Sequence, residues 1–154
     1  MIEGGCHCGE IRYRVDEEEF IDAGYCHCDI CRQTSGAPVL AWATFPFAAF
    51  SYTEGQPGVY RSSDWGQREF CGTCGTQVCY REIDDPLRID INVGSLDDPE
   101  TFEPEYHLYT AQQLDWFEVD DDLPRYEGAG PDGSGGTDDD DGPAGDDETI
   151  TRGD

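Results

Sequence analysis

Apolar and polar residues alternate along much of the chain before residue 127, with the period of two that is typical of half-buried β-strands. The alternation is clearest at residues 11–15 and 88–93, whereas residues 39–45 form an apolar run that predicts a buried strand. Three shorter segments complete the predicted strands: 58–61, 68–70 and 77–81. The pattern therefore predicts a mainly β protein.

Helical periodicity is nearly absent. Residues 29–35 predict one helical turn, because Gly36 and Pro38 end it. Short strands separated by frequent Gly and Pro are typical of an all-β sandwich or a barrel-like fold. No stretch approaches about 18 uninterrupted apolar residues, so neither a membrane span nor a membrane partner is expected.

The composition changes near Gly128. Residues 127–154 are mostly Gly, Asp, Ser, Thr and Pro, with consecutive aspartates at 138–141 and almost no large apolar residue. Such a segment cannot bury enough apolar surface to offset the entropy lost on ordering. We therefore expect one folded domain over residues 1–126 and a disordered acidic tail over residues 127–154.

The chain is strongly acidic and contains no lysine. Its formal net charge is -26 over 154 residues, and the excess of acid extends into residues 1–126. Such a charge repels itself at ordinary ionic strength, whereas at about 1 M salt the Debye length is about 3 Å and the repulsion is screened. The composition indicates a halophilic protein, and it argues against a nucleic-acid partner because no basic patch is present.

Candidate chemistry is concentrated in the cysteines, of which there are 8. Cys6 and Cys8 lie near the N-terminus, and Cys71 and Cys74 lie far downstream. Four thiolates complete a tetrahedral zinc site, which is the arrangement of structural zinc. These four residues are the predicted structural zinc site.

A second cluster supplies only three thiolates, from Cys26, Cys28 and Cys31. Three protein ligands leave a coordination position open for water or substrate. The difference between the clusters predicts two zinc ions per chain, one that holds the fold and one that performs chemistry. Cys79 is expected to be a small buried residue. If it closed the second site instead, the prediction of an open zinc would fail.

Disulfide bonds and redox pairs are the other uses of cysteine in proteins. The even number of cysteines would allow disulfides. The N-terminal residues lack the basic and apolar regions of a secretory signal, so we expect a cytoplasmic protein with reduced thiols. A redox Cys-x-x-Cys sits at a helix start, whereas the glycines around Cys71 and Cys74 are typical of a zinc knuckle between two strands.

Arg32 and His107 are further candidates for the site. Arg32 follows Cys31 directly and could receive a substrate carboxylate, or it could form a surface salt bridge. His107 could act as a general acid or base, or it could be packed and hydrogen-bonded. His7 and His27 lie between cysteine ligands, and their side chains are expected to point away from the metal.

Three cysteine motifs resemble those of the glutathione-dependent formaldehyde-activating enzyme family, also called the centromere protein V family. They are Gly5-Cys6-His7-Cys8-Gly9, residues 26–38 and residues 70–76. The resemblance continues through residues 94–99, His107, Trp116 and Leu123-Pro124. It implies an Mss4-like complex of short antiparallel sheets around zinc sites, with few helical turns.

The resemblance also implies an activity and a ligand assignment. The structural zinc of the family corresponds to Cys6, Cys8, Cys71 and Cys74, and the second zinc to Cys26, Cys28 and Cys31. The implied reaction is that of a carbon–sulfur lyase, which interconverts formaldehyde plus a thiol such as glutathione with the S-hydroxymethyl thiol. The alternative is a non-catalytic zinc module that binds a protein partner. The sequence leaves the thiol and the oligomeric state open.

The acidic composition predicts that stability depends on salt. Lowering the salt from about 1 M to about 0.1 M lengthens the Debye length to about 10 Å, so repulsion grows and Tm should fall. Deleting residues 128–154 is expected to leave Tm nearly unchanged. Thermal unfolding of both chains at both salt concentrations checks this. A Tm that rises as salt is removed contradicts the halophilic interpretation.

Overall fold

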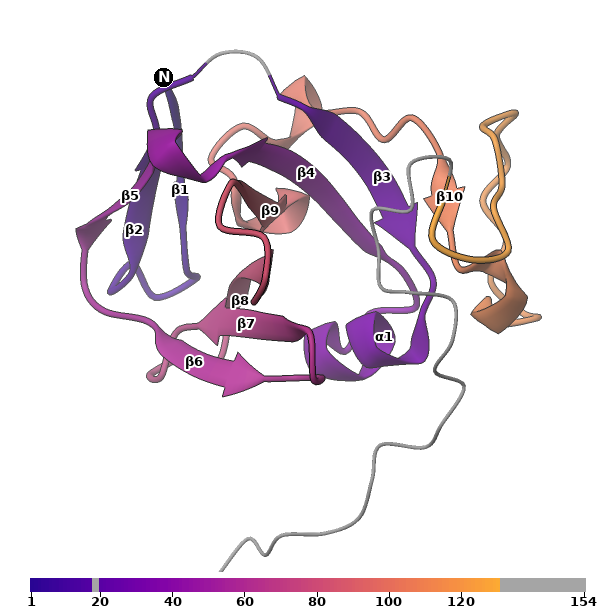
Figure 1. Cartoon of the computed structure of the whole chain (residues 1–154), viewed down its shortest axis with the longest axis horizontal. Helices are drawn as coiled ribbons and strands as arrows, with labels where there is room; N and C mark the ends of the chain where they lie inside the picture. Colours follow the sequence, from indigo (N-terminus) through magenta and orange to yellow (C-terminus); the bar gives the residue numbers. More distant parts are fainter. Residues whose placement is uncertain (18–19, 131–154) are drawn as a thin grey trace, which may run out of the picture.

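The computed structural model describes residues 1–17 and 20–130 and confirms a mainly β fold. The strands are β1 (Ile2–Gly5), β2 (Arg12–Val15), β3 (Asp22–Cys26), β4 (Leu40–Pro46), β5 (Phe50–Glu54), β6 (Gly58–Arg61), β7 (Gly66–Phe70), β8 (Gln77–Glu82), β9 (Arg88–Asn92) and β10 (His107–Leu108). They form a three-stranded sheet in the order β1-β2-β5 and a seven-stranded sheet in the order β10-β3-β4-β9-β8-β7-β6. The smaller sheet lies at one end of the larger one, and β10 lies at the other end (Figure 1).

Alternating side chains explain how the smaller sheet joins the core. On β2, Tyr13 and Val15 are buried, whereas Arg12 and Arg14 are only partly covered. The strand pairs with β1 and β5, both antiparallel. The Tyr13 hydroxyl hydrogen-bonds the Ser95 hydroxyl at 2.8 Å, so this sheet is also tied to the segment after β9.

The centre of the larger sheet is antiparallel and apolar. β4 pairs with β3 on one side and with β9 on the other, and Ala43 and Phe45 of β4 are fully buried. On β9, Ile89 and Ile91 point into the core while Asp90 alternates with them. Each buried isoleucine contributes roughly 1.5–3 kcal/mol relative to an exposed position.

The sequence pattern located most of these elements. The predicted strands correspond to β2, β4, β6, β7, β8 and β9, and the predicted helical turn is α1 (Asp29–Ser35). The pattern missed β1, β3, β5 and β10. The sheets are largely antiparallel, as expected, and among the described strands β10 is the exception, because it runs parallel to β3. The chain reaches β10 only after a long connection from β9, which permits a parallel approach.

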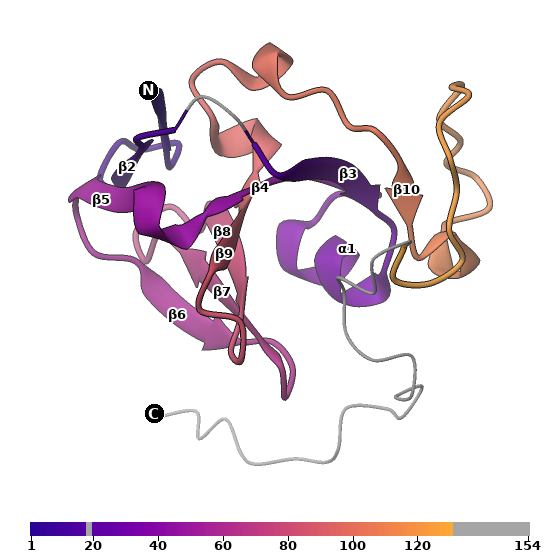
Figure 2. The ribbon, with the colours of Figure 1, turned by 45° about the horizontal axis from the view of Figure 1, so that its top comes forward.

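The helix α1 follows β3 directly and packs beside β4 (Figure 2). It ends at Gly36, whose positive φ of 70° suits a residue without a side chain and whose N–H donates to the Arg32 carbonyl. Short 3-10 turns occur at Phe47–Ala49, Val93–Ser95, Pro99–Thr101 and Thr110–Gln112. In the described part of the chain, no helix is long and apolar enough to cross a membrane.

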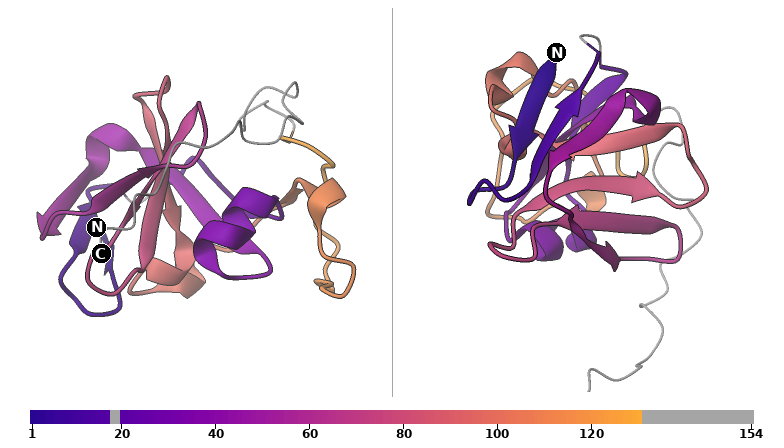
Figure 3. Two further views of the ribbon diagram at one scale, coloured as in Figure 1. Left: turned by 90° about the horizontal axis from the view of Figure 1, so that it is seen from below. Right: turned by 90° about the vertical axis from the view of Figure 1, so that its left-hand side faces the viewer.

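The strands near the N-terminus lie at one end of the molecule, and β10 with the residues after it lies at the other (Figure 3). The first residues of the predicted tail pack here. The Tyr109 N–H donates to the Gly128 carbonyl at 3.0 Å, and Ala129 is 6% exposed. Deleting residues 128–154 would remove these contacts, so the truncation expected to leave Tm nearly unchanged is one that begins after Gly130. Residues 131–154 lie outside the described residues, so the predicted disorder stays a prediction.

Asp90 makes stability depend on pH. Desolvation raises its pKa to about 6, although the Thr44 hydroxyl donates to it at 2.5 Å. The unfolded chain releases this proton near pH 4, so stability is fully present below that pH and falls as pH rises to about 6. Asp90→Asn removes a charge that desolvation disfavours at this half-buried position, and we expect it to be more stable than the wild type above pH 6 by about 1–2 kcal/mol.

Urea unfolding of both proteins between pH 4 and 7 checks this prediction. Asp84→Asn is the matched control, because it removes one carboxylate from an exposed position close in sequence. The control should keep the wild-type pH profile. If Asp90→Asn also keeps that profile, Asp90 is not the group responsible.

Candidate metal centres

The first cysteine cluster joins two distant loops. Cys6 and Cys8 follow β1, and Cys71 and Cys74 lie in the tight turn between β7 and β8. In that turn the Gly75 N–H donates to the Cys71 carbonyl at 2.9 Å, and Gly75 has a φ of 79° that glycine adopts at low cost. The backbone N–H of His7 donates to the Thr76 hydroxyl at 3.2 Å, which ties the two loops together.

The geometry of this cluster fits a metal ion. The Cys8 sulfur lies 3.5 Å from that of Cys6 and 3.7 Å from that of Cys71, and all four sulfurs lie within 4.8 Å of one another. Four sulfurs around one zinc ion would be separated by about 3.8 Å, because each Zn–S bond is about 2.3 Å long. Hydrogen bonds from Thr76 lower the pKa of Cys74 to about 5, which favours the thiolate that a metal requires.

The second cluster forms where β3 meets α1. Cys26 ends the strand, Cys28 caps the helix and Cys31 lies in its first turn. The Cys31 N–H donates to the Cys28 sulfur at 3.3 Å, and the sulfurs of Cys26 and Cys28 are 3.3 Å apart. The three sulfurs lie within 4.8 Å of one another, so this cluster could also hold a metal ion.

Cys79 does not join the second cluster. It is 1% exposed, and its sulfur lies 3.5 Å from a Glu69 carboxylate oxygen and 3.6 Å from the Tyr52 hydroxyl. Burial raises the pKa of Cys79 above its ordinary value, which keeps the thiol protonated. In residues 1–17 and 20–130, the second group of side chains that could hold a metal ion therefore consists of three cysteines.

Arg68 is the cation beside the second cluster, and the sequence did not reveal it. Its Nη2 donates to the Cys31 sulfur at 3.4 Å. Hydrogen bonds from Cys26 and Cys28, and then the charge of Arg68, lower the pKa of Cys31 to about 3. Arg32, which the sequence suggested, donates instead to the His27 carbonyl at 3.2 Å.

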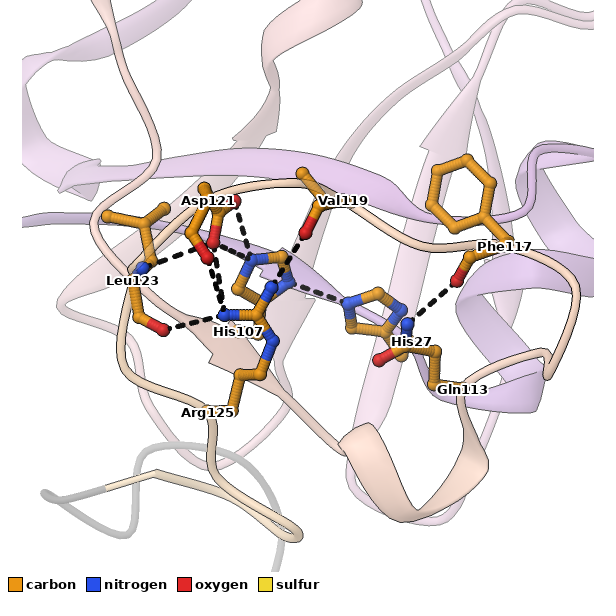
Figure 4. Close-up of polar contacts among 8 residues, drawn as sticks. All are labelled: His27, His107, Gln113, Phe117, Val119, Asp121, Leu123 and Arg125. Atoms are coloured by element: carbon orange, nitrogen blue, oxygen red, sulfur yellow. Dashed lines mark hydrogen bonds and ion pairs between the residues drawn. The ribbon is translucent and has the colours of Figure 1, made fainter.

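Two buried histidines contact each other next to the second cluster, since His27 lies between Cys26 and Cys28 in the chain, and Figure 4 shows the two rings. The Nε2 of His27 is 2.8 Å from the Nδ1 of His107, whose Nε2 is 3.0 Å from an Asp121 carboxylate oxygen. Because the carboxylate only accepts, His107 donates from Nε2 and accepts the N–H of His27 at Nδ1. The Nδ1 of His27 then carries a lone pair, and this buried atom has no partner in the structure. Burial lowers the pKa of His27 to about 4, which agrees with a neutral ring.

Asp121 is itself held in place. It forms an ion pair with Arg125 at 3.1 Å and accepts the backbone N–H of Leu123 at 3.1 Å (Figure 4). Arg125 also donates to the Val119 carbonyl at 2.8 Å. The chain after β10 is therefore tied, through the two histidines, to the turn that carries Cys26 and Cys28. The sequence suggested a packed role for His107 but gave no sign of its partners.

Together these features define a class: a cysteine-rich β protein with two candidate metal centres, one of four sulfurs and one of three. The family model for the glutathione-dependent formaldehyde-activating enzymes matches residues 1–112. The chain belongs to this family, as its motifs indicated, and it is an enzyme by that membership.

Two relatives carry names that agree with the assignment. A Halomonas elongata protein named as a glutathione-dependent formaldehyde-activating enzyme is 27% identical over 128 residues, which cover 78% of this chain and 82% of that protein. A Schizosaccharomyces pombe protein named as a lyase is 35% identical over 86 residues, or 51% of this chain and 56% of that protein. A crystal structure of a Rhodobacter sphaeroides protein is similar, with a TM-score of 0.50 and 28% identity over 62% of this chain and 87% of that one.

Removing the histidine link should weaken the fold. His107→Phe keeps the ring that stacks on Tyr25 but deletes the contacts to His27 and Asp121. The buried Nε2–H of His27 would then lack its acceptor. A buried donor without a partner costs about 1–3 kcal/mol, and we expect a loss of that size in the free energy of unfolding. Chemical denaturation measures it. Asp120→Asn, on the exposed neighbour of Asp121, should change stability by less than about 0.5 kcal/mol. Equal stability of the two variants contradicts the prediction.

Proposed function

We propose that this protein is a zinc-dependent enzyme of the carbon–sulfur lyase type. The reaction joins formaldehyde to a low-molecular-weight thiol, glutathione or another. A bond forms between the thiol sulfur and the carbonyl carbon, and the proton of the thiol ends on the oxygen of the S-hydroxymethyl product. The reverse reaction breaks the same bond. Family membership supports the reaction class, and the three-sulfur cluster is the observation that carries the proposal.

The two clusters take different roles in this proposal. Cys6, Cys8, Cys71 and Cys74 hold a structural zinc, and Cys26, Cys28 and Cys31 hold a second zinc with an open position. A zinc ion in the second site would supply a coordination position for the substrate sulfur or polarise the substrate oxygen. The eight free thiols of the structure suit a reducing compartment, which supports a cytoplasmic location.

The residues around the second cluster orient its sulfurs. Cys28 is fixed by the N–H of Cys31, and Cys31 is fixed by Arg68. His27 holds the turn between Cys26 and Cys28 through its contact with His107. Both ring nitrogens of His107 are engaged and the side chain is 1% exposed, so we assign it a positioning role in place of general acid or base.

Metal content distinguishes the two sites. The wild type should hold two zinc ions per chain. Cys31→Ser should stay folded and keep one, because the four-sulfur site is intact. Cys71→Ser should lose cooperative unfolding, since the binding energy of a structural zinc is folding energy. Elemental analysis and thermal melts of the three proteins check this, and a normally cooperative melt of Cys71→Ser contradicts the structural role.

Cobalt substitution tests whether the second site is open. A thiol that enters a three-sulfur site adds a sulfur ligand, so the sulfur-to-cobalt charge-transfer band of the wild type should intensify. The band of Cys31→Ser should respond weakly or not at all. A wild-type spectrum that is indifferent to added thiol would mean that the site is closed, and a non-catalytic module that binds a protein partner would then replace the enzyme.

A further inference from the structure

Arg68 is a buried cation that pairs with no carboxylate among the described residues. It lies on β7 and is 5% exposed. Five arginines of the described residues pair with Asp or Glu: Arg12, Arg14, Arg81, Arg88 and Arg125. Within residues 1–17 and 20–130, Arg68 forms no such pair, and the anionic group that it contacts is the Cys31 sulfur. A buried charge is costly unless it is paired and hydrogen-bonded, so this position requires an explanation in a chain with 35 acidic residues.

The guanidinium of Arg68 has N–H donors beyond those used in the described contacts. Its Nε donates to the Ser62 hydroxyl at 3.0 Å and its Nη2 to Cys31 at 3.4 Å. In the amide orientation that satisfies its neighbours, the Gln77 oxygen accepts from Nη1 at 3.1 Å. The group also lies over the ring of Tyr80, 5.0 Å from its centre. Because a guanidinium carries five N–H donors, two are left beyond these three bonds.

A pocket with a volume of about 410 Å³ adjoins this guanidinium. Val59, Tyr60 and Phe70 give it apolar walls, and Thr34 and Gln77 add polar groups beside Arg68. Thr34 lies on α1, one helical turn after Cys31, so the pocket and the second cluster share both the helix and the arginine. Its size is within the range of small-molecule sites.

We propose that this pocket binds the part of the substrate thiol that carries a carboxylate, and that Arg68 is the residue that selects for it. The inference rests on the proposed function, which places the thiol sulfur beside Cys31. Since an Arg68 nitrogen lies 3.4 Å from the Cys31 sulfur, a carboxylate two carbons from a sulfur bound there comes within its reach. An arginine can grip a carboxylate with two parallel N–H bonds.

The positive charge of Arg68 favours binding of an anion at this pocket in an otherwise acidic protein. The net charge of -26 disfavours anions over the molecule as a whole. Three thiolates on one divalent ion leave a negative centre, and a fourth thiolate would add to it. The buried positive charge of Arg68 offsets both the sulfur that it contacts and the incoming anion. A neutral thiol of equal size carries no carboxylate, so Arg68 then offsets only the charge of the Cys31 sulfur.

Two small thiols of matched shape test the inference on the full-length cobalt protein: 3-mercaptopropionate and its neutral amide, 3-mercaptopropionamide. Titration of the charge-transfer band gives a Kd for each. The wild type should bind the carboxylate roughly 10-fold more tightly or better, the size expected for a hydrogen bond to a charged group. Arg68→Gln should lose this preference. Arg61→Gln, which removes one positive charge from an exposed arginine on β6, should keep it.

The possible results separate this inference from the function on which it rests. If the wild type binds both thiols equally well, selection by Arg68 is wrong and the open site stands. If neither thiol changes the spectrum, the open site falls and the inference with it. Should Arg68→Gln fail to fold, Gln77→Glu decides, because it keeps Arg68 but places a competing carboxylate against it. That variant should lose the preference, and a retained preference overturns the proposal.

Discussion

The rest of the structure depends on the convergence of four sulfurs at the junction of the two sheets. Cys6 and Cys8 extend from β1 of the smaller sheet, and Cys71 and Cys74 connect two strands of the larger one. Without a link, the smaller sheet would rely on its apolar face and a few polar contacts, such as the one between Tyr13 and Ser95. The zinc ion proposed here would stabilise a small domain with a modest core, because the folded chain offers it a complete site and the unfolded chain does not.

The second cluster is held from two sides instead. On one side, Arg68 reaches Cys31 from β7. On the other side, His27 connects the turn between the remaining cysteines to His107 and Asp121. Each of these contacts comes from a segment distant in sequence. The positions of the three sulfurs therefore depend on how the larger sheet packs. Local spacing of cysteines alone would permit many arrangements of the same sulfurs.

The sequence pattern predicted those elements whose own residues show alternation of apolar and polar side chains or turn glycines. Ile89 and Ile91 alternate with Asp90, so β9 was visible, and glycines around Cys71 and Cys74 marked the turn after β7. In contrast, β3 contains Gly24, which has no side chain to reveal burial. A β-carbon there would lie 3.0 Å from the ring of Trp42, so close packing and not alternation defines this strand. The strand β10 is only two residues long and shows no period at all.

The candidate site also contains features that the sequence could predict and features that it could not. The grouping of the cysteines into two clusters could be predicted because metal ligands obey short spacing rules, and the structure brings the same cysteines together. The contact between His27 and Asp121 passes through His107, and that of Arg68 with Cys31 spans 37 residues. No local rule encodes either one, since both join segments that only the tertiary fold brings together.

A simple expectation is that a structural metal site is more buried than an open one, but the two clusters show the opposite. Cys8 and Cys74 of the four-sulfur cluster are exposed, whereas Cys26 and Cys31 of the three-sulfur cluster are buried. A closed site tolerates water, because every position around its metal is filled by protein. An open site benefits from a dry wall, since electrostatic interactions strengthen where water is excluded, and the single contact of Arg68 with Cys31 then matters more than an exposed ion pair would. The more protected cluster is thus the one to which the proposed function assigns the chemistry.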